Sequence, residues 1–122
     1  MEPQDTITIA PSVLITVTRH AALSVKGVSR MGNLPAQVGH LLRGHPMGQG
    51  IALEVEDNTV KVELYVVVDP GVKMRDASQA LQQTVKRAIE ELVGMQVLSV
   101  NVHVEDVDVR PDESGDAPDS AG

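Results

Sequence analysis

The sequence contains no cysteine and almost no aromatic residues. Its 122 residues include one tyrosine, Tyr65, and neither phenylalanine nor tryptophan. Without cysteine the chain cannot form a disulfide, a thiolate metal site or a cysteine nucleophile, which fits a reducing compartment. Without aromatic side chains it lacks the platforms on which single-stranded nucleic acids stack. The core must therefore be built from valine, leucine, isoleucine, alanine and methionine, which with Tyr65 make up 42% of the chain.

The sequence also lacks a hydrophobic run long enough to cross a membrane, for which about 20 residues are needed. The N-terminal stretch MEPQDTITIA has neither the basic start nor the apolar centre of a secretion signal. We therefore expect a soluble, cytoplasmic protein. Any contact with the membrane should be peripheral or made through a partner.

The formal net charge of −7 is unevenly distributed. Residues 105–122 hold seven carboxylates against Arg110 alone, a charge of −6, and the remaining ten acids and nine bases give −1. By contrast, residues 6–53 contain no carboxylate. Their cationic and titratable side chains are Arg19, Lys26, Arg30 and Arg43 with His20, His40 and His45. The first half of the chain is thus locally basic within an acidic protein.

Apolar spacing in the first half predicts a strand, a helix and a loop. Residues 6–9 (TITI) alternate as in a short strand. A helix is expected to begin at Pro11-Ser12 and to end at Gly27, with an inward face that includes Val13, Leu14, Val17, Ala21 and Val25. Residues 29–50 are rich in glycine and predict a long flexible loop with a short helix at 36–42.

The second half reads as strand, strand, helix, strand. Residues 51–56 alternate, Asp57-Asn58 predicts a tight turn, and Val60 to Val68 form a long apolar strand. After the Pro70-Gly71 turn, an amphipathic helix is expected from about Met74–Asp76 to Gly94, with an apolar stripe at Ala77, Leu81, Val85, Ala88 and Leu92. In the last strand, Val100, Val102 and Val104 are expected to face the core.

This order, β-α-β-β-α-β, predicts an α+β fold. We expect a two-layer sandwich with a mixed or antiparallel sheet of 3–4 strands and two helices on one face, in an arrangement that could be ferredoxin-like. The single domain should span residues 1–107. Residues 108–122 (DVRPDESGDAPDSAG) have too few apolar side chains to pack and are expected to form a disordered acidic tail.

Three blocks of the sequence resemble the alkaline shock protein family, the envelope stress response proteins of Gram-positive and related bacteria. The blocks are ITIAPSVLITVTRHAALSVKGVSRM, GIALEVEDNTVKVELYVVVDPGVKM, and the second long helix followed by VLSVNVHVEDV; together they extend from residue 6 to residue 107. Thr6 stands where the family often has glycine, and Pro70 where an aromatic residue is common.

The resemblance implies a non-enzymatic, abundant cytoplasmic protein linked to envelope homeostasis. Some members of the family gather at the membrane by binding a small membrane-anchored protein. A protein partner of this kind is therefore expected, with a homo-oligomer as a further form of association. The family has no catalytic motif, so the resemblance assigns no functional residue.

The residues themselves also point away from catalysis. His40 and His45 are five positions apart with no acidic residue near them in sequence, a poor ligand spacing for zinc. Asp69 and Asp76 flank the start of a helix, where acids are favoured for electrostatic reasons alone. No nucleophile elbow, phosphate-binding loop or dinucleotide fingerprint occurs. We expect no enzyme activity, no metal and no cofactor.

One candidate partner-binding surface is the acid-free segment that carries Arg19, Lys26, Arg30, Arg43 and His45. These side chains could meet phospholipid headgroups, an acidic partner or the chain's own acidic tail. The alternative function is a small nucleic-acid-binding α+β module that uses the Arg19–His45 segment. The overall acidity and the lone tyrosine make nucleic acid an unfavoured partner.

The other candidate surface is the outer face of the predicted sheet. Tyr65 and Val67, flanked by Ala52, would form an exposed apolar patch there, suited to self-association. His103 projects from the last strand with no structural role evident from the sequence.

Overall fold

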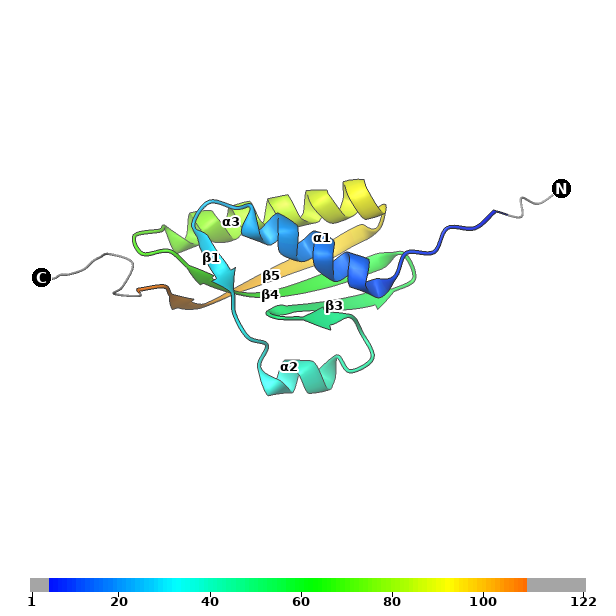
Figure 1. Cartoon of the computed structure of the whole chain (residues 1–122), viewed down its shortest axis with the longest axis horizontal. Helices are drawn as coiled ribbons and strands as arrows, with labels where there is room; N and C mark the ends of the chain where they lie inside the picture. The colour runs from blue at the N-terminus through cyan, green and yellow to red at the C-terminus, as the bar shows by residue number, and fades with distance from the viewer. Residues whose placement is uncertain (1–4, 110–122) are drawn as a thin grey trace, which may run out of the picture.

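A computed structural model describes residues 5–109 of the chain. Two long helices lie side by side over one face of a sheet (Figure 1). A short third helix lies apart from them, beyond the edge of the sheet that residues 47–56 form. In chain order the elements are α1 (Pro11–Leu23), β1 (Val28–Met31), α2 (Ala36–Leu41), β2 (Met47–Gly48), β3 (Ile51–Glu56), β4 (Thr59–Val68), α3 (Met74–Ala88), the π-helical turn η1 (Ile89–Val93) and β5 (Gln96–Val107).

The sheet is organised around β4, which pairs with three other strands. Along one edge β4 runs parallel to β5, from the pair Thr59–Gln96 to the pair Val68–Val107. Along the other edge, β3 pairs antiparallel with the first part of β4, and β1 pairs antiparallel with its last part. The two-residue strand β2 adds outside β3. The result is a mixed five-stranded sheet.

The predicted α+β fold, with its two long helices on one sheet face, is confirmed, but the strands differ from the expectation. Residues 6–9 form no strand, so the described chain begins with a helix. The segment 29–50, predicted as a loop with one short helix, supplies the end of β1, all of β2 and α2. The predicted β-α-β-β-α-β order and the predicted count of 3–4 strands are therefore wrong: the described chain begins with α1, and its sheet has five strands. The edge of β4 that a first strand could have used is taken by β1 and β3.

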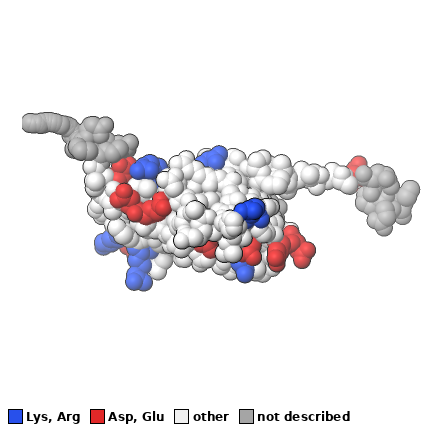
Figure 2. Space-filling model, turned by 90° about the horizontal axis from the view of Figure 1, so that it is seen from below, with Lys and Arg blue, Asp and Glu red and all other residues white. Residues whose placement is uncertain are grey.

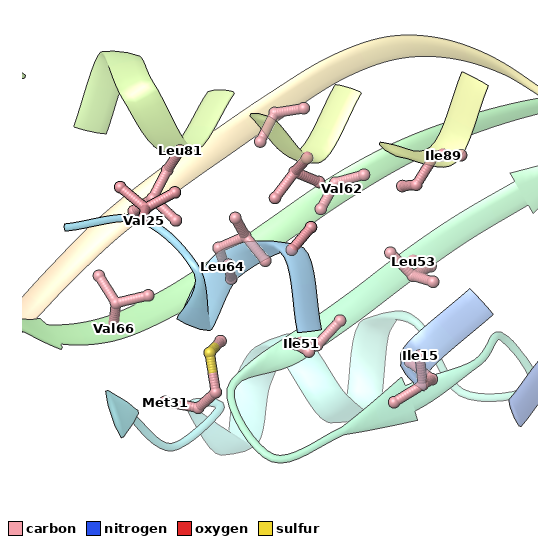
Figure 3. Close-up of a cluster of buried hydrophobic side chains, with 14 of the residues drawn as sticks. Ile15, Val25, Met31, Ile51, Leu53, Val62, Leu64, Val66, Leu81 and Ile89 are labelled. Carbon is pink, nitrogen blue, oxygen red and sulfur yellow. The ribbon is translucent and has the colours of Figure 1, made fainter. Parts of the chain in front are cut away.

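The core lies between the sheet and the two long helices (Figure 3). As predicted, the inward side chains of β4 are fully buried: Val60, Val62, Leu64, Val66 and Val68. Leu81 and Val85 of α3 and Ile89 of η1 pack against them and are also fully buried. Burying a side chain of this kind stabilises the fold by about 1.5–3 kcal/mol.

Two residues expected to face the core are exposed instead. Val13 points outward because α1 buries Leu14, Ile15 and Thr18, a face rotated by about one residue from the predicted one. Leu92 is 74% exposed because the chain widens into the π-helical turn η1 before Gly94 ends it. A π turn shifts the helical register, so the stripe that continues through Ile89 does not extend to Leu92.

The folded part extends past the predicted domain boundary at residue 107. Asp108, assigned from the sequence to the tail, is buried. Its backbone N–H donates to the carbonyl oxygen of Val68 at 2.8 Å, and the Ser29 hydroxyl donates to its carboxylate. Asp108 thus ties the end of β5 to β1 and β4. The predicted disorder of residues 110–122 concerns positions outside the described residues.

Gly32 and Gly50 meet at the backbone of Tyr65, where β1 gives way to β3 along the edge of β4. The N–H of Gly32 donates to the Tyr65 carbonyl at 2.7 Å, and the N–H of Tyr65 donates to the Gly50 carbonyl at 2.8 Å. Gly50 has φ +69°, and a Cβ placed there would lie 2.6 Å from the Tyr65 carbonyl oxygen. Gly50 therefore serves a close backbone approach, which a side chain would prevent.

Replacing Gly50 by alanine should lower the free energy of unfolding by about 3 kcal/mol or more, because backbone strain and a backbone clash coincide. Gly44 provides the matched control, since it has φ +93° but open space around its Cβ position. Gly44→Ala should cost only the strain, about 1 kcal/mol. Urea unfolding of both variants measures the difference; equal losses would show that the close approach at Gly50 is unimportant.

Thr18 is the buried side chain of α1 whose hydroxyl has no hydrogen-bond partner among residues 5–109. An unpaired buried hydroxyl costs about 1–3 kcal/mol relative to an apolar group of the same shape. Thr18→Val should therefore raise the free energy of unfolding by about 1 kcal/mol. Thr16→Val, at an exposed position of the same helix, should leave it nearly unchanged, and thermal unfolding compares the two. A loss of stability in Thr18→Val would contradict the assignment.

Candidate interaction surfaces

The outer face of the sheet carries a polar cluster centred on Glu63. The parallel register of β4 and β5 sets Tyr65 opposite His103 and Glu63 opposite Asn101. The rings of Tyr65 and His103 stack with centroids 4.3 Å apart and planes 9° from parallel. One Glu63 oxygen lies 2.8 Å from Nε2 of His103, and the other accepts a 2.7 Å hydrogen bond from the Asn101 amide. The sheet twist and pairing thus bring together residues 40 positions apart.

The apolar patch predicted on this face is absent. Tyr65 is only 8% exposed and Val67 only 2%, and Ala52 is fully buried. The His103 ring covers one face of the Tyr65 ring, which accounts for part of its burial. The prediction that Tyr65 and Val67 are exposed is therefore wrong. His103, which lacked a structural role in the sequence, acquires one as the residue that stacks on Tyr65 and pairs with Glu63.

The negative charges of two carboxylates act on the Tyr65 hydroxyl. Burial raises the pKa of Tyr65 above its ordinary value of 10.0, and the negative charges of Glu63 and Glu105 raise it further. Glu105 is itself held in place, because its carboxylate accepts a 2.9 Å hydrogen bond from the Asn33 N–H. The cluster therefore favours the neutral phenol.

The raised pKa of Tyr65 predicts how stability depends on pH. The folded protein holds the phenolic proton more tightly than the unfolded chain, so the contribution of Tyr65 is fully present below about pH 10 and is lost as pH rises through the folded pKa. Tyr65→Phe removes that group. The free energy of unfolding of the Tyr65→Phe variant should fall less between pH 9 and pH 11 than that of the original protein. Identical slopes in denaturant titrations would contradict the prediction.

The predicted basic residues are exposed but spread over several elements. Arg19 lies on α1, Lys26 follows α1, Arg30 lies on β1 and Arg43 follows α2. Arg43 contacts His40 locally, with Nη2 2.7 Å from Nδ1. On the face shown in Figure 2, basic and acidic side chains lie in small separate groups, and no continuous basic surface is visible.

His45 differs from the other residues of that segment because it is partly buried. Its Nδ1 accepts a hydrogen bond from the N–H of Val55 at 3.2 Å. This bond, with the 3.0 Å bond from Leu53 N–H to the Pro46 carbonyl, fastens the segment before β2 to β3. His45 thus has a structural role that its position in a glycine-rich segment did not reveal.

Sequence reasoning missed an open apolar groove between the two long helices. Its walls come from α1 and from α3 with η1, and its lining residues include Val17, His20, Ala21, Arg87, Ala88 and Leu92. The alanines are too short to fill the space between the helix axes, and Leu92 stands exposed at its margin. The signal that could have found it is the row of small residues Ala21, Ser24, Thr84 and Ala88 on facing helices.

Other features bear on the class of protein. Within residues 5–109, no three acidic or histidine side chains converge in a way that could hold a metal ion. Nor is any helix of that range both long and apolar enough to pass through a bilayer. The described fold therefore defines a compact α+β domain whose conspicuous surface features are a polar cluster and an apolar groove.

Comparison with known proteins identifies the family of the chain. Residues 1–109 match the profile of the alkaline shock protein family, described as having a cell envelope-related function, and the chain belongs to this family. It is 32% identical over 102 residues to the uncharacterized protein Spy1535 of Streptococcus pyogenes serotype M6, covering 83% of this chain and 78% of that one. No solved structure matches the chain.

Two relatives from Bacillus subtilis strain 168 show the same extent of similarity. The uncharacterized protein YqhY is 25% identical over 109 residues, covering 85% of this chain and 81% of YqhY. The uncharacterized protein YloU is 26% identical over 106 residues, covering 84% of this chain and 88% of YloU. The similarity thus covers most of the length of each chain.

Proposed function

We propose that this protein is a non-enzymatic interaction protein of the cell envelope response, which acts from the cytoplasm by binding other proteins at or near the membrane. The observation that carries the proposal is the match of residues 1–109 to an envelope-related family. The expected partner is a protein, in the simplest case a small membrane-anchored one. The domain then reaches the membrane through that partner.

The arrangement of polar side chains supports binding over catalysis. The outer-face cluster is internally paired: Glu63 binds His103 and Asn101, and Glu105 binds a backbone N–H. A general acid or base needs a free position beside a cleft where substrate can lie, and the groove between the helices lies on the opposite side of the domain from this cluster. The groove itself is mainly apolar, which suits a protein surface better than a reactive group.

The basic residues supply a test of the contact surface. Arg19 and Arg30 are exposed and belong to the acid-free segment, whereas Lys61 is exposed on the outer face of β4. A photo-crosslinking amino acid at position 19 or 30 should capture envelope proteins in living cells. The same group at position 61 provides the control for position 19 on α1, whereas Arg30, which pairs with Val67, shares the outer sheet face with Lys61.

The proposal expects position-dependent crosslinks that are enriched in the membrane fraction and contain a membrane-anchored protein. Equal crosslinking at positions 19, 30 and 61 would argue against a defined surface in the basic segment. Crosslinks confined to nucleic acid or to ribonucleoproteins would replace the proposal with the nucleic-acid-binding alternative.

A further inference from the structure

The described N-terminal residues form an extended arm without a partner strand. Thr6 to Ile9 alternate threonine and isoleucine, the pattern of a half-buried strand. Yet Ile7 is 91% exposed and Ile9 46% exposed, and no backbone hydrogen bond joins residues 5–9 to the rest of the described chain. The arm runs outward from the start of α1 (Figure 1). A strand-forming sequence with exposed isoleucines and unpaired backbone groups can pair with the open edge of another strand.

β5 offers the complementary feature, an edge strand 12 residues long. Among the described strands it pairs only with β4, so its second edge carries no strand. Side chains of the α3–η1 helix occupy the first part of this edge. Glu90 accepts a 3.1 Å hydrogen bond from the Val97 N–H, and Gln82 donates a 3.2 Å bond to the Val100 carbonyl.

Beyond Val100 this protection ends. Successive peptide groups of a strand point to alternate edges, so the N–H and C=O of Val102 and Val104 share the outward direction of Val100. No side chain of α3 or η1 reaches them with a hydrogen bond among the described residues. Both valine side chains are partly buried and pack against the core. Residues 101–104 therefore present an edge with open backbone groups beside apolar side chains, which is a template for strand addition. The open edge ends there, because the pairing with β4 is irregular between Val104 and Asp106 and the Val107 N–H donates to the Asp106 carboxylate at 2.8 Å.

We propose that the arm of one copy, residues 6–9, adds as a strand parallel to residues 101–104 of β5 in a second copy, so that the N–H of Thr8 points to β5. Its backbone would satisfy the groups of Val102 and Val104. With Ile7 and Ile9 on the core side, their side chains would extend the row of valines. The proposal goes beyond the envelope role and does not depend on it.

Reach explains why the partner is a second copy. Ile7, Ile9 and Pro11 line the same hollow as Val93 and Met95, so the arm lies beside the start of β5. Residues 101–104 begin about 20 Å further along the strand, at roughly 3.3 Å per residue. The arm before Pro11 spans at most about 20 Å when fully extended. It can therefore reach the beginning of its own open edge but cannot lie along it.

The first test measures the mass of the full chain by light scattering over a range of concentrations. The original protein should associate, and Thr8→Pro should weaken association roughly tenfold or more, because proline removes one N–H and blocks the ladder. Thr8→Ser, which keeps the N–H, should behave like the original protein. Position 8 lies outside the core, so circular dichroism should report the same fold for all three.

The absence of cysteine allows a second test by engineered disulfides. A chain carrying Thr8→Cys, mixed with a chain carrying His103→Cys and oxidised, should form the mixed disulfide, because Thr8 would lie opposite the exposed His103. Gln79→Cys, at an exposed position of α3, is the control and should give little product. A protein that stays monomeric at all concentrations, a Thr8→Pro variant that associates as well as the original, or equal crosslinking to positions 79 and 103 would overturn the proposal.

Discussion

Strand β4 is the element on which the rest of the structure depends. Its inward side chains are fully buried, and its two edges hold β5 on one side and both β3 and β1 on the other. A strand with neighbours on both edges and helices over one face must be apolar on that face, as every second residue of VKVELYVVV is. Pairing with β4 fixes which side chains of β1, β3 and β5 face the core. The helices α1 and α3 and the turn η1 then pack on the inward side chains of β4.

The same dependence explains the glycine-rich segment between α1 and β3. Two strands share one edge of β4, so the chain must leave that edge after Met31 and return to it at Ile51. At the meeting point, Gly32 and Gly50 both hydrogen-bond to the backbone of Tyr65. The glycine-rich sequence of this segment suggests flexibility. At Gly32 and Gly50, however, the glycines allow the backbone to pack closely against Tyr65. The helix α2 lies within the excursion between them (Figure 1).

The outer face shows how a parallel pairing creates a site from residues that look unrelated in sequence. Glu63, Tyr65, Asn101 and His103 come together because β4 and β5 run in register across the α3 crossover. The sequence left His103 without a structural role and did not reveal its contact with Tyr65. Conversely, it placed Tyr65 and Val67 in an exposed patch, because alternation alone says which residues share a face and not what covers it. The basic residues were correctly expected at the surface, but they lie on separate elements.

The sequence by itself determined the α+β class, the two long helices, the hairpin of β3 and β4, the apolar face of β4 and the family resemblance. All of these rest on local periodicity, turn chemistry or residue order, which are visible along the chain. Only the tertiary structure decided which edge each strand occupies, that residues 6–9 have no partner, that Asp108 belongs to the fold, and that an apolar groove lies between α1 and α3. Those features depend on contacts between distant segments, and a short strand forms only where an edge is open to receive it.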